Sequence, residues 1–129
     1  MLKQFSILTV LAVSLVAGTA DAETVSAHQF WQLHRSAETG NPMIVDVRSN
    51  EEYLAGHLPN AVNVPYDEIS KLIKIAPDKS QAIFLYCHSG RRAVIAETEL
   101  SKLGYSQLYN GESYQKLLSA MPSQPYTKN

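Results

Sequence analysis

Cysteine is nearly absent from this chain, and so is any imbalance of charge. The single cysteine, Cys87, cannot form a disulfide within the chain. Lysine and arginine total 11 and aspartate and glutamate total 12, which gives a formal net charge of -1 at pH 7. Such a chain has no general field that attracts nucleic acid or an anionic membrane, so electrostatic recognition must be local. We therefore expect neither as a partner.

Glycine and proline are also scarce, with six of each among 129 residues, while 45% of the residues are hydrophobic. This composition excludes a collagen-like or low-complexity chain and is typical of a globular protein. The length suits one small domain and is too short for two independent cores. We expect the domain to occupy residues 23–121 and an irregular polar tail to follow over residues 122–129.

Long apolar stretches are confined to the N-terminus. Lys3 precedes a mainly apolar run over residues 5–17, and Ala20-Asp21-Ala22 follows it. The run has 13 residues, fewer than the roughly 20 that a membrane-spanning helix needs. This order is typical of a secretory signal peptide over residues 1–22, cleaved after Ala22 or Ala20. We expect the mature protein to lie in a bacterial periplasm, without stable membrane association.

Such a compartment constrains Cys87. In an oxidising space an unpaired thiol is exposed to oxidation or mispairing unless it is buried or used. The sequence must therefore give Cys87 either a place in the core or a chemical role.

Beyond the leader, short apolar runs alternate with amphipathic stretches. Ser26-x-x-Gln29 has the spacing of a capping box and opens a helix whose Phe30, Trp31 and His34 share one face. We expect strands over residues 43–47, 61–64, 82–86 and 107–109. We expect further helices over residues 51–55, 67–76 with Asp67 as the cap, 93–103 with Gly104 ending it, and 114–121 with Met121 on its apolar face.

This alternation predicts an α/β fold. Strands and helices that alternate every dozen or so residues are joined by right-handed crossovers into a parallel sheet. Residues 82–86 form the most hydrophobic run after the leader, which is typical of a central strand covered on both faces. We therefore expect a single domain with a central parallel sheet of about five short strands and helices on both faces.

Cys87 follows that central strand and opens the segment Cys87-His88-Ser89-Gly90-Arg91-Arg92, which leads into the next helix. In parallel sheets, ligands bind outside the carboxyl ends of the strands. The free N–H groups of a helix start and the two arginines favour an anion there, either the thiolate or a small oxyanion. Gly90 supplies the backbone freedom that such a loop needs. We therefore predict that Cys87 is reactive.

Other uses of Cys87 fit these residues less well. A buried structural cysteine explains neither Gly90 nor the arginine pair. A thioredoxin-type site needs a Cys-x-x-Cys pair. A cysteine phosphatase needs an arginine where Ala93 stands, so this loop is one residue short. A zinc site needs converging ligands, and no metal is expected because the histidines are scattered: His28, His34, His57 and His88.

Two separated blocks carry a more specific pattern. Residues 46–65 read DVRSNEEYLAGHLPNAVNVP, and residues 86–93 read YCHSGRRA. Together they resemble the rhodanese family, in particular its exported single-domain thiosulfate sulfurtransferases of the phage-shock type. The first block is similar to that family's Asp-Val-Arg, Glu-Glu-Phe, Gly-His-Ile-Pro-Gly-Ala and Asn-Ile-Pro segments, and the second to its six-residue active loop, Cys-x-x-Gly-x-x. The resemblance extends over residues 26–118.

This resemblance implies sulfur transfer in two half-reactions, in which a Cys87 persulfide carries the outer sulfur of thiosulfate to cyanide or a thiol. No metal or cofactor beyond that covalent persulfide is implied. The sulfonate end of the donor would meet the two arginines, of which Arg92 is the weaker candidate because the helix start can turn it outward. The implied substrate-binding residues are His88, Ser89, Gly90, Arg91 and Arg92.

Four residues of the first block are interpreted as structural support. Asp46, Arg48 and Glu52 have the spacing of a partly buried ion-pair network that braces the active loop. His57 is expected to cap or to hydrogen-bond locally.

The chain departs from the family pattern at three positions. Asn60 replaces a usual glycine, and asparagine tolerates a left-handed backbone. Ala93 removes a hydroxyl group that many members carry beside the loop. Tyr114 stands where an aromatic residue, often tryptophan, is usual.

Two other functions stay open on the sequence alone. One is a rhodanese-like module that carries persulfide or senses redox state for a partner protein. The other is a phosphatase or arsenate reductase on the same fold. The expected partners are a small-molecule sulfur donor and acceptor, with a protein thiol as a further acceptor, and the expected oligomeric state is a monomer.

Overall fold

The computed structural model describes residues 23–123. The predicted signal peptide over residues 1–22 lies outside the described residues, and so does the predicted tail over residues 122–129 from residue 124 onward. Within the described part of the chain, no helix combines the length and the apolar character needed to cross a membrane.

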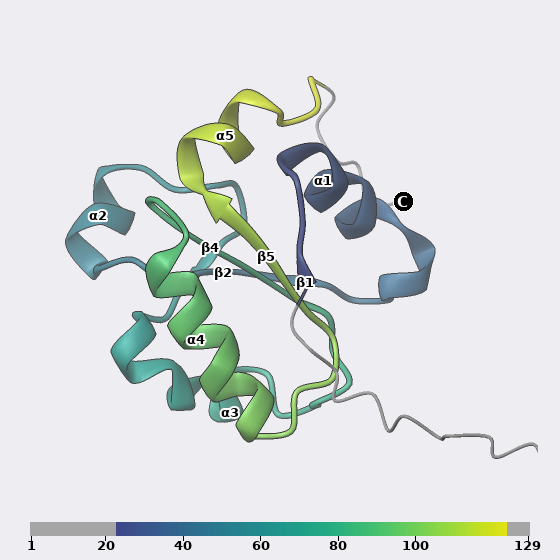
Figure 1. The fold of residues 1–129 in the computed structure, drawn as a ribbon, viewed down its shortest axis with the longest axis vertical. Coiled ribbons are helices and arrows are strands. Elements are labelled where there is room, and N and C mark those ends of the chain that lie inside the picture. Colours follow the sequence, from purple (N-terminus) through teal and green to yellow (C-terminus); the bar gives the residue numbers. More distant parts are fainter. Residues whose placement is uncertain (1–22, 124–129) are drawn as a thin grey trace, which may run out of the picture.

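Five parallel strands form one sheet in the order β1-β5-β4-β2-β3 (Figure 1). The predicted α/β class and the central position of the most hydrophobic strand are confirmed. The sequence patterns did not indicate β1, which is a two-residue strand at the edge of the sheet. The strands are β1 Glu23–Thr24, β2 Met43–Asp46, β3 Val62–Asn63, β4 Ile83–Cys87 and β5 Leu108–Ser113.

Helical segments cover both faces of this sheet (Figure 1). On one face lie α4 and the η2–α3 segment, and on the other lie α1 and α5. The short helix α2 follows β2. The helical bounds are α1 Ala27–Arg35, η1 Ala37–Thr39, α2 Asn50–Ala55, η2 Tyr66–Lys71, α3 Leu72–Ile75, α4 Arg91–Lys102 and α5 Tyr114–Ser119.

Local sequence determines several of the boundaries. The predicted capping box of α1 is present, with Ser26 Oγ accepting from the N–H of Gln29. Ser49 and Glu52 form a second box at the start of α2. Asn60 adopts the left-handed backbone expected of it, with φ of 62°. Gly104, with φ of 98°, follows the end of α4 as predicted.

Two helix predictions were wrong. Asp67 does not cap the third helical segment, which begins after Pro65 as the 3-10 helix η2 without a side-chain cap. Proline fixes its own φ and so starts a helical turn without such a cap. Met121 lies beyond the end of α5 and is 37% exposed, because the last helix stops at Ser119.

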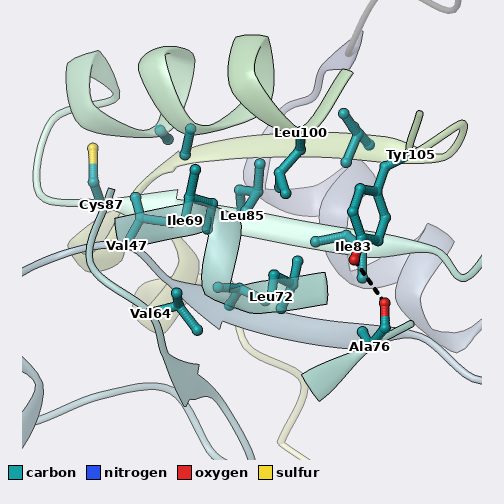
Figure 2. Close-up of a cluster of buried hydrophobic side chains, with 14 residues drawn as sticks. Val47, Val64, Ile69, Leu72, Ala76, Ile83, Leu85, Cys87, Leu100 and Tyr105 are labelled. Atoms are coloured by element: carbon teal, nitrogen blue, oxygen red, sulfur yellow. Dashed lines mark hydrogen bonds between the residues drawn. The ribbon is translucent and has the colours of Figure 1, made fainter. Parts of the chain in front are cut away.

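The two faces of the sheet bury separate hydrophobic clusters. Between the sheet and α4, Ile83, Leu85 and Cys87 of β4 pack against Leu100 and the η2–α3 segment (Figure 2). Tyr105 closes the far end of this cluster by donating a hydrogen bond to the Ala76 carbonyl at 2.7 Å. Figure 2 shows Cys87 at the opposite end, so the core itself positions the thiol.

On the other face, α1 and α5 pack on Phe84 and Tyr86 of β4. Phe30 contacts Phe84 edge to face at a centroid distance of 5.1 Å. The Trp31 Nε1 donates to the Leu117 carbonyl at 2.8 Å and ties α1 to α5. Gly111 of β5 lies directly under Phe30.

Gly111→Ala tests this packing. A Cβ at position 111 would lie 2.5 Å from Phe30 Cδ2 and 3.1 Å from Leu117 Cδ1, which forces buried side chains apart. Overpacking of this kind costs about 1–3 kcal/mol of unfolding free energy, measurable by urea denaturation. Gly40→Ala is the control, because nothing lies within 4 Å of a Cβ there and only its positive φ opposes the change. A loss no greater at Gly111 than at Gly40 would contradict this account.

Candidate active site

The carboxyl ends of the parallel strands meet at one edge of the sheet and bring the predicted site residues together. Asp46 ends β2, Cys87 ends β4 and Ser113 ends β5. Cys87 is paired with Ser113 in the β4–β5 ladder. The nucleophile predicted from the sequence therefore lies at the strand end where ligands bind in parallel sheets.

Cys87 lies at the bottom of the loop that joins β4 to α4. The residue is 1% exposed, and its Sγ accepts a hydrogen bond from the Gly90 N–H at 2.8 Å. Gly90 has φ of 102°, a left-handed conformation that glycine adopts at little cost, and it is the N-cap of the 12-residue helix α4. Of the N–H groups expected from His88 to Arg92, that of Gly90 thus points at the sulfur.

The other residues of the loop differ in their exposure. His88, Ser89 and Arg91 are exposed, whereas the adjacent Arg92 is half-buried. The expectation that the helix start turns Arg92 outward was wrong. Its guanidinium reaches back to α2 and forms two hydrogen bonds with the Glu52 carboxylate, at 2.6 and 2.9 Å.

This pair also corrects the predicted ion-pair network. Glu52 pairs with Arg92 and not with Arg48, because the fold places α2 beside the start of α4. The hydrogen bonds from Arg92 lower the pKa of Glu52 to about 2. Conversely, the Glu52 carboxylate raises the pKa of Arg92, and the nearby Cys87 thiolate adds to that rise. The Arg92 guanidinium is therefore held as a fixed cation at the start of α4, where it interacts electrostatically with Cys87.

Arg48 belongs to a second, more deeply buried cluster. Asp46 is fully buried and Arg48 is 5% exposed. The Arg48 Nη2 donates to Asp46 Oδ2 at 2.7 Å and to the Gly56 carbonyl at 2.6 Å. The guanidinium lies 4.3 Å from the centre of the Tyr114 ring. These contacts join β2, the end of α2 and the start of α5.

Tyr86 completes this cluster from β4. Its hydroxyl donates to Asp46 Oδ2 at 2.8 Å and accepts from the Leu58 N–H at 3.1 Å. Burial raises the pKa of Tyr86, and the adjacent Asp46 carboxylate contributes in the same direction. The phenol therefore stays protonated and serves as a hydrogen-bond donor between two strands.

His57 makes the local contacts that were expected of it. Its ring stacks on Tyr53 with centroids 3.8 Å apart, and its Nδ1 lies 2.8 Å from the Tyr53 carbonyl oxygen. The ring is exposed, and its contact with the Tyr53 carbonyl lies at the carboxyl end of α2.

Three residues near the site were missed by sequence reasoning. Tyr86 was taken only as part of an apolar strand, although a tyrosine beside the cysteine at a strand end offers a hydroxyl for the neighbouring strand. Asn63 donates to the Asp46 and Arg48 carbonyls at 3.0 Å each. Glu112 packs on Gly90 with a left-handed φ of 65°, and nothing in the sequence indicates either property.

The groups at the candidate site are a thiol and nitrogen donors rather than a set of metal ligands. Among residues 23–123, no group of three or more histidine, cysteine, aspartate or glutamate side chains could hold a metal ion. The groups that the fold brings together are a thiol, a helix N-terminus and two arginines. This arrangement suits nucleophilic chemistry on an anionic substrate.

Known proteins share both the fold and the sequence pattern. The family model of the rhodanese-like domain matches residues 28–113, which is more than half of the chain. The chain belongs to the rhodanese family. The loop from Cys87 to Arg92 lies within the matched range, and so do the residues of the two supporting clusters except Tyr114, which directly follows that range.

Similarity to individual proteins agrees with this family. The thiosulfate sulfurtransferase PspE of Escherichia coli is 35% identical over 79 residues, covering 60% of this chain and 74% of PspE. A thiosulfate:glutathione sulfurtransferase of Saccharomyces cerevisiae is 32% identical over 107 residues, covering 70% of this chain and 77% of the yeast protein. A solved structure of a rhodanese with anions from E. coli superposes with a TM-score of 0.58 at 32% identity, covering 63% and 94% of the two chains.

Glu52→Gln tests the contribution of the Arg92 pair to stability. Because the folded state holds the pKa of Glu52 at about 2, below its ordinary 4.5, the pair stabilises the fold above pH 4.5. That contribution is lost as the pH falls towards 2. Both side chains are partly exposed, so we expect the variant to lose only about 1 kcal/mol at pH 7. Unfolding in urea at several pH values measures the difference.

The neighbouring Glu51→Gln is the matched control, because Glu51 is exposed in the same first turn of α2. We expect little change from it at any pH. Equal losses for the two variants, or a Glu52 effect that grows on acidification, would contradict the assigned pair.

Proposed function

We propose that this protein is a sulfurtransferase that moves the outer sulfur of thiosulfate to cyanide or a thiol through a persulfide on Cys87. The observation that carries this proposal is the Cys87 sulfur at the end of β4, hydrogen-bonded at 2.8 Å to the N-cap of α4. The rhodanese family of the chain and its similarity to named thiosulfate sulfurtransferases support the same reaction.

In the first half-reaction, the Cys87 thiolate attacks the outer sulfur of thiosulfate. A sulfur–sulfur bond forms with Sγ, and the bond from the outer sulfur to the sulfonate breaks. The electron pair of that bond leaves with sulfite. The Gly90 N–H is placed to stabilise the anionic sulfur throughout, and a preorganised donor of this kind is worth about 3 kcal/mol where it faces developing charge.

In the second half-reaction, the acceptor attacks the outer sulfur of the persulfide. Cyanide leaves as thiocyanate, whereas a thiol becomes a persulfide, and the Cys87 thiolate is regenerated in both cases. The scheme asks for no metal and no organic cofactor. The similarity to a thiosulfate:glutathione sulfurtransferase favours a thiol as the natural acceptor.

The arginines recognise the charged end of the donor in this scheme. Arg91 is exposed at the first position of α4 and free to meet a sulfonate at the mouth of the loop. Arg92 is already paired with Glu52 and contributes mainly a fixed positive charge beside the thiol. Because Cys87 is only 1% exposed, we expect the exposed side chains of His88 and Ser89 to shift when thiosulfate reaches the sulfur.

The proposal includes export to the periplasm with removal of residues 1–22. Intact mass of the protein recovered from the periplasm tests this directly, because cleavage after Ala22 leaves a chain that begins at Glu23.

Intact mass also tests the persulfide. We expect the purified protein to gain the mass of one sulfur atom on treatment with thiosulfate and to lose it again on addition of cyanide. Cys87→Ser should show no gain while its circular dichroism spectrum and urea midpoint stay close to those of the wild type. A Cys87→Ser protein that still forms thiocyanate from thiosulfate and cyanide would sink the proposal.

Different results would favour the other functions. A persulfide that discharges slowly to every small acceptor but rapidly to one protein would indicate a carrier module. Hydrolysis of an aryl phosphate without any reaction with thiosulfate would indicate a phosphatase.

Arg91→Ala tests recognition of the donor. We expect the KM for thiosulfate to rise about fivefold, because the variant loses one solvent-exposed ion pair worth about 1 kcal/mol. The rate at saturating thiosulfate should change little, since Arg91 binds the sulfonate before and during attack alike. Lys102→Ala removes an equal charge from the other end of α4 and is the control. A KM that rises equally in both variants would mean that only net charge matters.

A further inference from the structure

Behind the loop, α4 and β5 bury two polar side chains that the mechanism does not use. Glu97 of α4 is 8% exposed, and Asn110 of β5 is fully buried. Their Oε2 and Nδ2 atoms have no hydrogen-bond partner among residues 23–123. An amide nitrogen is a donor and a carboxyl oxygen is an acceptor, so the two neighbouring groups are complementary. Buried polar atoms left without partners are rare and point to a role.

Asn110 connects this pair to the active loop. Its Oδ1 accepts a hydrogen bond from the Glu112 N–H at 2.8 Å. Glu112 has a left-handed φ of 65°, which a residue with a side chain keeps only where its surroundings hold it. This residue lies in the irregular part of β5, where three steps along β5 match two along β4.

Glu112 in turn packs on the N-cap of α4. Its Cβ and Cγ lie 3.3 and 3.4 Å from the position that a Cβ on Gly90 would take. The Gly90 N–H donates to Cys87 Sγ. A continuous series of contacts therefore leads from Asn110 through Glu112 and Gly90 to the nucleophile, and the buried Glu97 carboxyl group neighbours Asn110 at the start of that series.

We propose that Glu97 is a positioning residue for the active loop, which acts through Asn110 and Glu112 on the hydrogen bond from Gly90 to Cys87. A neutral Glu97 accepts from the Asn110 amide without repelling Glu112. An ionised Glu97 faces the Glu112 carboxylate, and the repulsion moves Glu112 away from Gly90. The consequence for sulfur transfer rests on the proposed function, whereas the reactivity of the thiol does not.

The elements that pack against α4 are η2, β4 and β5. On α4 its neighbours one turn away are Ala93, Val94, Leu100 and Ser101. From β4, the side chains that face α4 are Ile83, Leu85 and Cys87.

From η2, Asp67 lines a hollow together with Val94, Thr98 and Lys102 of α4. From β5, Asn110 and Glu112 are the polar groups that act on the Glu97 carboxyl group. Burial raises the pKa of Glu97, the Asn110 amide opposes that rise and the Glu112 carboxylate adds to it. The folded state therefore keeps a proton that the unfolded chain releases, so ionisation at higher pH destabilises the fold.

The test compares wild type with Glu97→Gln, which keeps the size and hydrogen-bonding capacity of the side chain but cannot ionise. The rate constant for alkylation of Cys87 by iodoacetamide is measured from pH 5 to pH 8 in both proteins. Taking the ratio of the two constants cancels the ordinary titration of the thiol. We expect the ratio of wild type to variant to fall about threefold across this range.

Glu99→Gln is the matched control, because Glu99 is exposed two residues further along the same helix. Its ratio to wild type should stay constant with pH. Thermal unfolding is measured alongside, and the Tm of Glu97→Gln should exceed that of wild type by an amount that grows with pH. A constant alkylation ratio with a pH-dependent Tm difference would make Glu97 purely structural and overturn the proposal.

Glu112→Gln provides a second variant that does not alter Glu97. Removing the charge that an ionised Glu97 repels should flatten the pH dependence of alkylation, and an unchanged profile would count against the proposed coupling. Alkylation needs only the thiol, so these outcomes stand whether or not the protein transfers sulfur. If the protein forms the persulfide but the alkylation ratio stays constant with pH, the proposed function stands and only the proposed role of Glu97 is wrong.

Discussion

Strand β4 pairs in parallel with β2 on one side and with β5 on the other. That pairing fixes the position of each group at the site, because it brings the carboxyl ends of all three strands to one edge. Cys87 ends β4 between the buried Asp46 cluster and the irregular end of β5. The helix that follows starts close to the sulfur, because only three residues separate Cys87 from α4. The last of them is the left-handed Gly90, whose N–H donates to the sulfur.

Two polar clusters hold this edge in different ways. The Asp46–Arg48–Tyr86 cluster is buried and multiply hydrogen-bonded, so each charged or polar group depends on the others for its partners. The Glu52–Arg92 pair is partly exposed and links α2 to the loop side of α4. The first cluster joins the ends of β2 and β4 through Asp46. The second holds the partly exposed Arg92 guanidinium on the same side of the sheet as the active loop.

The position of Cys87 combines burial in the core with a place in the candidate active site. The residue is buried in the α4-side core and also receives a hydrogen bond from a helix N-terminus. Burial limits contact with oxidants, while the donor favours the anionic sulfur that nucleophilic chemistry requires. A thiol in this setting depends on the packing behind the loop, which is why Asn110 and Glu112 matter although neither reaches the sulfur.

The sequence by itself determined the α/β class, the central strand, the capping box of α1, the left-handed Asn60 and the candidate nucleophile. These features depend on periodicity, on local backbone preference or on residues adjacent in the chain. Only the tertiary structure decided that Glu52 meets Arg92 rather than Arg48, that Tyr86 bonds Asp46, and that Glu97 lies behind the loop. Each of these contacts joins residues far apart in sequence or depends on which helix face is buried. The geometry of the whole sheet sets such distances, and no local pattern encodes them.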